Sequence, residues 1–224
     1  QQLLNGILNH RIQLYNINDI TGLMKTTGAK WWEKENKKEN FYCRKILSNQ
    51  QMGYLKDRQK EEAIISLLSF MNHHQQDDSR VIFGDISKAF DSINHKKLIK
   101  LLQKTFHLSD DCCFINYVRD MYEGLYHTTQ VNNSYSDVEK QEVGIKQGCC
   151  LSPLLFIIFF NHVIEKFNNF NFKGKVVVFA YADDIAVGVQ KKEDVEQALK
   201  LLYTALQELG LNLNVKKTKI MATH

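Results

Sequence analysis

Apolar residues recur at intervals of three and four along several stretches of this chain, a spacing that predicts amphipathic α-helices. These stretches are residues 1–20, 60–73, 94–104, 111–125 and 193–209. Gly210 follows the last stretch, and glycine commonly stands just beyond the end of a helix. Residues 21–50 fit neither the helical nor the strand period, so we interpret them as a surface insertion.

Residues 152–167 have a different pattern, because every position from 154 to 160 is apolar. A helix that is apolar on all sides is expected in the centre of a fold. Ser152 is a favourable N-cap, and Pro153, the only proline in the chain, suits the first helical position, where its missing N–H costs nothing. We therefore expect a buried central helix that Ser152 caps.

Other segments have the composition of β-strands. Residues 81–86 are short, β-branched and aromatic, and they contain a carboxylate near their end. Residues 176–181 and 185–190 flank an Asp pair, which predicts a hairpin with its carboxylates at the tip. A second hairpin is expected around Asn132, and alternation over residues 211–215 predicts an edge strand.

Composition narrows the class of protein without deciding its function. The chain has 224 residues, 44% hydrophobic and 24% charged, which excludes collagen-like, disordered and coiled-coil proteins. A net charge of +4 is compatible with a nucleic-acid partner but is common in other proteins too. No apolar run approaches the roughly 20 residues that a membrane span needs.

The cysteines and the start of the sequence bear on location. Five cysteines, an odd number without CxxC spacing, are expected to be reduced thiols. No secretory leader is visible, so we expect an intracellular protein, with nothing to separate nucleus from organelle.

Three carboxylates are the candidate reactive groups. If the strand that carries Asp85 lies beside the hairpin, Asp85, Asp183 and Asp184 converge on one edge of a sheet. Carboxylates without Cys or His partners suit hard cations, above all Mg²⁺. Two alternatives stay open: an Asp pair is common in turns, and Asp85 is also a good helix N-cap.

Four segments then resemble reverse transcriptases, in the family's order. They are DxxKAFD at 85–91, GxxQGxxxSPxxF at 144–156, Tyr-Ala-Asp-Asp at 181–184 and GLxxNxxKT at 210–218. The stretch at 51–54, Gln-Met-Gly-Tyr, is similar to a weaker QxGF segment upstream. The KAFD residues of the first segment and the QGCxLSPxLF residues of the second resemble the enzymes of non-LTR retrotransposons and group II introns.

The resemblance implies an α+β fold, the palm of a right-hand polymerase, in which an antiparallel sheet has helices packed on one face. Residues 81–224 would form this palm, and residues 1–80 part of the fingers, with an insertion near 21–50. The family's basic fingers segment has no match, and the chain ends at His224 before a helical thumb. Other protein chains, or sequence outside this chain, are expected to supply those parts.

The resemblance also implies a metal site. Asp85, Asp183 and Asp184 would hold two Mg²⁺ ions, with Mn²⁺ as a substitute, and the backbone oxygen of Ile86 would be a further ligand. Two such ions clamp the attacking and leaving oxygens of a phosphoryl transfer.

The remaining implied roles concern the substrate. Phe90 would exclude a ribonucleotide 2′-OH, and Gln147 with Gly148 would contact the template base and incoming nucleotide. Tyr181 would back the primer end, and Lys217 would steady or protonate the leaving pyrophosphate. Simpler interpretations stay open for three of them: Phe90 as a core aromatic, Tyr181 as a packed ring and Lys217 as a solvated lysine.

The function implied is an RNA-directed DNA polymerase that adds dNTPs to a DNA or RNA primer on an RNA template. The alternative is a catalytically silent descendant that serves as a structural or RNA-binding subunit of a larger complex. An RNA-dependent RNA polymerase fits less well, because Phe90 stands where RNA synthesis needs room for a 2′-OH.

Overall fold

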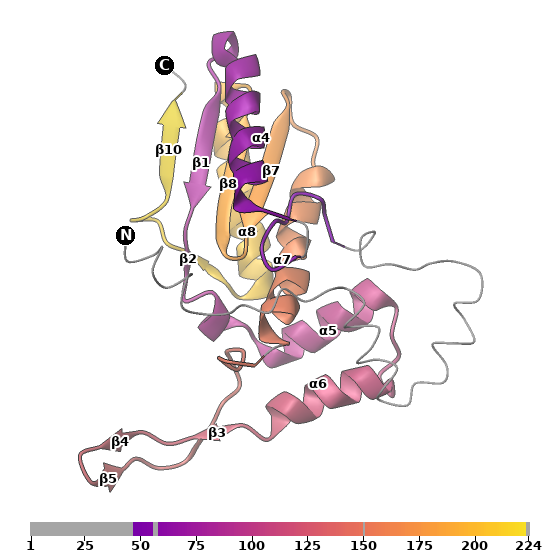
Figure 1. Cartoon of the computed structure of the whole chain (residues 1–224), viewed down its shortest axis with the longest axis vertical. Coiled ribbons are helices and arrows are strands. Elements are labelled where there is room, and N and C mark those ends of the chain that lie inside the picture. The colour runs from indigo at the N-terminus through magenta and orange to yellow at the C-terminus, as the bar shows by residue number, and fades with distance from the viewer. Residues whose placement is uncertain (1–46, 56–57, 150, 223–224) are drawn as a thin grey trace.

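The computed structural model describes residues 47–55, 58–149 and 151–222. The helix predicted over residues 1–20 and most of the insertion at 21–50 lie outside the described residues. At the centre is an antiparallel four-stranded sheet with the strand order β10-β1-β8-β7 (Figure 1). Its strands are β1 (Arg80–Gly84), β7 (Val176–Tyr181), β8 (Asp184–Val189) and β10 (Lys219–Ala222).

Helices cover both faces of this sheet, so the architecture is mixed α+β. They are α4 (Lys60–His73), α5 (His95–Phe106), α6 (Cys113–Glu123), α7 (Ser152–Asn168) and α8 (Val195–Leu209). Single 3-10 turns are η2 (Gln75–Asp77), η3 (Phe90–Ser92) and η4 (Lys192–Asp194). The predicted helices at 60–73, 94–104, 111–125 and 193–209 are thus confirmed within a few residues.

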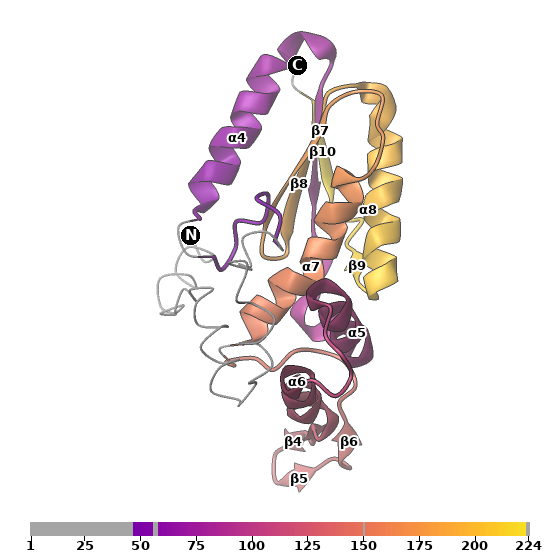
Figure 2. The same cartoon turned by 90° about the vertical axis from the view of Figure 1, so that its right-hand side faces the viewer.

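The expectation that helices pack on one face only is wrong. Figure 2 shows α7 and α8 on one side of the sheet and α4 on the other. The neighbours Val81 and Ile82 point to opposite faces of β1 and are both fully buried, so both faces need cover. The Phe70 ring of α4 supplies part of it, lying 2.8 Å from the point that a Cβ on Gly188 would occupy.

The buried central helix is confirmed, with one correction at its start. Twelve residues of α7 are buried, including Phe156, Phe159 and Phe160. Ser152 is not the N-cap: the cap position is Leu151, and Ser152 is already helical. The Ser152 hydroxyl donates instead to the Lys146 carbonyl at 2.7 Å, which ties the helix to the loop before it.

The predicted edge strand at 211–215 is also corrected. Only β9 (Asn212–Leu213) forms there, and it pairs with β2 (Ile86–Ser87) outside the main sheet. A turn follows, in which the Thr218 amide and hydroxyl both donate to the Asn214 carbonyl. This turn redirects the chain, so β10, and not residues 211–215, forms an edge of the main sheet.

The hairpin around Asn132 is confirmed and lies on a ribbon that projects past α6 (Figure 1). The ribbon comprises β3 (Tyr126–His127), β4 (Gln130–Val131), β5 (Ser134–Tyr135) and β6 (Glu139–Lys140).

Within the described ranges, no helix is long and apolar enough to cross a bilayer.

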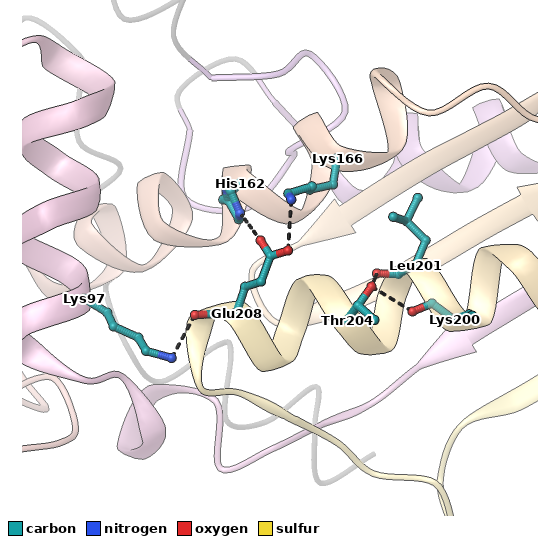
Figure 3. A network of polar contacts seen from close by, with 7 residues as sticks. All are labelled: Lys97, His162, Lys166, Lys200, Leu201, Thr204 and Glu208. Carbon is teal, nitrogen blue, oxygen red and sulfur yellow. Dashed lines mark hydrogen bonds and ion pairs between the residues drawn. The ribbon is translucent and has the colours of Figure 1, made fainter.

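Glu208 joins three helices on the outside of the core (Figure 3). Its carboxylate accepts hydrogen bonds from Lys166 Nζ at 2.9 Å and His162 Nε2 at 3.0 Å, both on α7. Its backbone carbonyl, near the end of α8, accepts from Lys97 Nζ on α5 at 2.8 Å. The contact with Lys97 also places a cation at the negative end of a helix, which is favourable.

We expect the Glu208 ion pairs to make stability depend on pH. The hydrogen bonds from His162 and then Lys166 lower the pKa of Glu208. The stabilisation is therefore present above the unfolded-state pKa and is lost as the pH falls through the lower folded-state pKa. Glu208→Gln should lower the free energy of unfolding at neutral pH by at most about 1 kcal/mol, because water reaches these pairs.

The measurement is urea denaturation of wild type and variant at neutral and acidic pH. The difference in the free energy of unfolding between wild type and Glu208→Gln should vanish at acidic pH. Glu142→Gln is the matched control, because Glu142 is exposed and makes no ion pair with any described residue. A difference that persists in acid would contradict the assignment.

Candidate functional site

Strand register brings the three predicted carboxylates together. In the β1–β8 pairing Gly84 lies opposite Ile185, so Asp85 follows β1 beside the start of β8. The β7–β8 hairpin pairs Tyr181 with Asp184, which leaves Ala182 and Asp183 as its two-residue turn. The acids from two distant motifs therefore share one end of the sheet.

The three carboxylates interact electrostatically. Burial raises the pKa of Asp183, a hydrogen bond from its backbone opposes this rise, and the charge on Asp85 adds to it. Partial desolvation, then the charges of Asp183 and Asp85, raise the pKa of Asp184. The charge of Asp85 thus makes ionisation of both hairpin acids more costly, and a cation between the carboxylates would relieve that cost.

Lys217 forms an ion pair with Asp85. Its Nζ lies 3.7 Å from Asp85 Oδ2, although 70% of the Lys217 side chain is exposed. Lys217 is held near the acids because β9 and the turn after it return the chain to Asp85, whose carbonyl accepts from the Asn214 amide at 2.8 Å. The sequence predicted that Lys217 belongs to the site, and the structure places it beside the carboxylate of Asp85.

The donor chemistry fits a hard divalent cation, although no ion cage is preformed. Across the described part of the chain, no three His, Cys, Asp or Glu side chains are grouped so as to hold a metal. The Asp85, Asp183 and Asp184 oxygens are nevertheless the ligand type that Mg²⁺ prefers. Burial is the main cause of the raised pKa values of Asp183 and Asp184, and a bound cation would offset the cost of ionising them.

The backbone of Ile86 has the orientation that a further ligand needs. The Asn214 amide donates to the Asp85 carbonyl, so residues 85 and 214 form a hydrogen-bonded pair. The next pair, Ile86 with Leu213, is then of the non-bonded kind, and the Ile86 carbonyl points away from β9. The Ile86 side chain itself is buried in the core.

Phe90 lies in a stack of aromatic rings. Its ring packs on Phe156 of α7 at a centroid distance of 4.3 Å and an interplanar angle of 13°. Tyr54 approaches the Phe90 ring edge-on at 6.4 Å. Phe90 is only partly buried, so it is a ring fixed from below with surface left toward solvent.

The loop that carries Gln147 is tied to the segment around Phe90. The amide of Ile145 donates to the Phe90 carbonyl at 2.9 Å, and Gln147 Nε2 donates to Asp91 Oδ1 at 3.1 Å. Gly144 and Gly148 both have positive φ, 92° and 78°, which explains glycine at these positions. Gln147 and Gly148 are exposed beside the aromatic stack.

Sequence reasoning assigned no role to the segment at 51–54. Burial, then the charge of Asp183, raises the pKa of Tyr54, so this phenol lies near the hairpin acids. A pocket of about 480 Å³ opens between α4 and the sheet, with Tyr181 and Asp184 in its wall. The similarity of residues 51–54 to QxGF was the available signal, but it carried no information about contacts.

The comparison with protein families decides the membership. The family model for "Reverse transcriptase (RNA-dependent DNA polymerase)" matches residues 29–224. The chain belongs to the reverse transcriptase family. This reverse transcriptase domain is related to the enzymes of non-LTR retrotransposons, as the motifs predicted.

Individual relatives make this kinship concrete. The domain is 27% identical over 143 residues to a retrovirus-related Pol polyprotein from a type-1 R2 retrotransposable element of Nasonia vitripennis, covering 62% of this chain and 14% of the relative. It is 32% identical over 136 residues to the RNA-directed DNA polymerase from the mobile element jockey of Drosophila funebris, covering 59% and 14%. The chain therefore spans about one seventh of these relatives.

Solved structures show the same fold in a distant enzyme. Apo telomerase from Candida tropicalis superposes with a TM-score of 0.66 at 14% identity, over 93% of this chain and 37% of that one. Telomerase of the same organism in complex with a telomeric RNA fragment gives 0.64 at 14% identity, over 94% and 34%. The reverse transcriptase domain described here thus shares its fold with about a third of each telomerase chain.

We expect the crowded carboxylates to cost the metal-free protein stability. A carboxyl with a folded-state pKa raised above its unfolded value favours folding when protonated, and that advantage is lost as the pH rises through the two values. Asp183→Asn removes the charge, so in EDTA at neutral pH the variant should melt about 1–4 °C higher, equivalent to roughly 1 kcal/mol or less.

Thermal unfolding across a pH series checks this expectation. The increase in the melting temperature of Asp183→Asn over wild type should shrink toward zero below pH 3.8, the ordinary pKa of an aspartate. Asp137→Asn, at an exposed position on the projecting ribbon, is the control and should not change the melting temperature at neutral pH. A lower melting temperature for Asp183→Asn would refute the electrostatic account.

Proposed function

We propose that this domain is the polymerase core of an RNA-directed DNA polymerase, which adds dNTPs to a primer 3′-OH on an RNA template. One observation carries the proposal: Asp85 and the tip of the β7–β8 hairpin meet at one end of the sheet, beside the partly exposed ring of Phe90. In the reaction the 3′-oxygen attacks the α-phosphorus of a dNTP. The bond to the β-phosphate breaks, and pyrophosphate leaves.

Asp85, Asp183 and Asp184 are the residues that would hold the metal ions, with the Ile86 carbonyl as a further ligand. Two bound Mg²⁺ ions, or Mn²⁺, supply Lewis-acid stabilisation of the attacking and leaving oxygens. The carboxylates of this chain would hold those ions in position. Lys217 Nζ lies 3.7 Å from Asp85 Oδ2. A cation at this place could bind the negatively charged pyrophosphate as it leaves, which supports the assignment of Lys217 to that role.

The side chains around Phe90 would form the nucleotide pocket. Because Phe90 stacks on the fully buried ring of Phe156, its ring cannot recede toward the core without disturbing that packing. A fixed ring is a steric barrier to a 2′-OH. Gln147 and Gly148 are exposed next to it, with backbone and amide groups available to a template base and a nucleotide. Tyr181, in the wall of the adjoining pocket, would support the primer end.

The fold likeness to telomerase supports a domain assignment. We propose that residues 81–224 are the palm of a right-hand polymerase, and that residues 1–80 belong to the fingers. The partners would be an RNA template, a DNA or RNA primer and dNTPs. Because the chain spans a small part of its relatives, protein segments that grip the triphosphate and the duplex would come from outside it.

A catalytically silent, RNA-binding or structural role is the second candidate. It is favoured by the ion pair of Asp85 with Lys217 and by the lack of a preformed ion cage among the described residues. The intact set of three acids favours catalysis instead, because the charge of Asp85 raises the cost of ionising Asp183 and Asp184 and a silent protein gains nothing from that cost.

Primer extension tests the choice. With labelled dNTPs, an RNA template and Mg²⁺ or Mn²⁺, wild type should extend the primer. The rate for Asp183→Asn should be at least about 10³-fold lower, because the variant lacks a carboxylate proposed to hold the metal ions. The control Asp137→Asn should extend normally. Equal product from wild type and Asp183→Asn, or none from wild type when the segments outside this chain are also supplied, would refute the enzyme assignment.

We expect Phe90 to set the choice of sugar. Phe90→Val should raise incorporation of rNTPs relative to dNTPs about tenfold or more, because the steric barrier becomes smaller. Phe90→Tyr keeps the ring and should keep the discrimination. Phe172→Val, in a separate aromatic cluster with Phe167 and Phe170, controls for general loss of packing. Unchanged discrimination in Phe90→Val would exclude Phe90 as the barrier.

A further inference from the structure

Residues 50–52 lie along the outer side of β7 and are bonded to it. Gln51 forms a parallel bridge with Ala180. The Met52 amide donates to the Ala180 carbonyl at 2.8 Å, and the Ala180 amide donates to the Gln50 carbonyl at 2.9 Å. The segment is anchored at its start because Asn161 Oδ1, on the buried helix α7, accepts from the Ser48 amide at 2.8 Å.

The side chain of Gln51 turns from this position into the hairpin tip. It is fully buried, and its Oε1 accepts hydrogen bonds from the Ala182 amide at 3.3 Å and the Gly53 amide at 2.9 Å. Ala182 precedes Asp183 and has a φ of 57°, a left-handed conformation that a residue with a Cβ adopts only at a cost. The hydrogen bond that Gln51 accepts from Ala182 therefore acts on the strained residue next to Asp183.

Gly53 permits this close approach. A Cβ at Gly53 would lie 2.3 Å from the Ala182 nitrogen, closer than any side chain allows. The contact is backbone against backbone, so neither partner can move aside cheaply. Gln51 and Gly53 together hold the turn from the side opposite to β8.

The arrangement has a cost that a purely structural residue would avoid. Within the described structure, Gln51 Nε2 is buried and has no hydrogen-bond partner. An unpaired buried donor opposes folding, so an apolar side chain of the same length would remove this cost. What Gln51 offers here, and an apolar side chain would not, is the Oε1 acceptor for the amides of Ala182 and Gly53.

We propose that Gln51 is a positioning residue for the candidate active site, which fixes the Ala182–Asp183 turn and so the direction of the Asp183 carboxylate. This inference rests on the proposed polymerase function for its effect on rate, but its effect on the turn is independent of that function.

Amide hydrogen exchange of the complete chain tests the effect on the turn. Gln51→Met keeps the length and removes the acceptor, so exchange at Ala182 should speed up about tenfold, as expected for one lost hydrogen bond. Exchange at Ile82 and Val187, in the sheet centre, should not change. Gln51→Glu retains an acceptor and should restore protection at Ala182.

Primer extension tests the effect on rate. Gln51→Met should lower kcat about 10- to 100-fold with KM for dNTP nearly unchanged, because a misdirected carboxylate affects the reacting atoms more than nucleotide binding. Gln190→Met is the matched control. Its amide bonds the opposite end of the same hairpin, to Lys175 and Asp77, and its loss should leave kcat unchanged.

The outcomes separate the two proposals. Unchanged exchange at Ala182, or equal loss of protection throughout the sheet, would overturn the positioning role. Normal kcat in Gln51→Met would overturn it as well. If wild type has no polymerase activity when the segments outside this chain are also supplied, the proposed function fails, and exchange at Ala182 alone decides the role of Gln51.

Discussion

The pairing of β1 with β8 is the constraint on which the candidate site depends. Its register places Ile82 opposite Val187 and Gly84 opposite Ile185, so Asp85 emerges beside the acids of the hairpin. Side chains alternate between the two faces of a strand. A one-residue slip of β1 or β8 would therefore turn its buried side chain, Ile82 or Val187, out of the core that it shares with α7. The apolar core thus holds the register, and the register holds the carboxylates together.

The site combines this rigid support with unfavourable electrostatics. α7 is buried on almost all sides, and its Phe156 supports Phe90 from below. Above this support, burial and the charge of Asp85 raise the pKa values of Asp183 and Asp184, and Lys217, which pairs with Asp85, is mostly exposed. A stable core can bear this local cost. The result is a set of carboxylate oxygens that the strand register holds at one end of the sheet.

Several elements could be predicted because their signals are local. The period of apolar positions located α4 and α8 closely, and the Asp pair between two β-branched runs predicted the β7–β8 hairpin with its tip at Asp183. The errors arose where a neighbour outside the local pattern decides the structure. Ser152 has the chemistry of an N-cap, but the Lys146 carbonyl binds its hydroxyl and the helix begins one residue earlier than a cap would allow. The alternation over 211–215 is real, yet the turn after Asn214 ends it and gives the sheet edge to β10.

The sequence by itself determined the family, the positions of the acids and the main elements, since motifs, turns and apolar periods are written in neighbouring residues. Tertiary structure alone decided which groups meet: that α4 covers the second face of the sheet, that Lys217 lies near Asp85, and that Gln51 binds the amide of Ala182 from 131 residues away in the chain. The physical reason is that these contacts depend on the register of strands and on the packing of helices. Both are set by the whole core, and no short stretch of sequence contains that information.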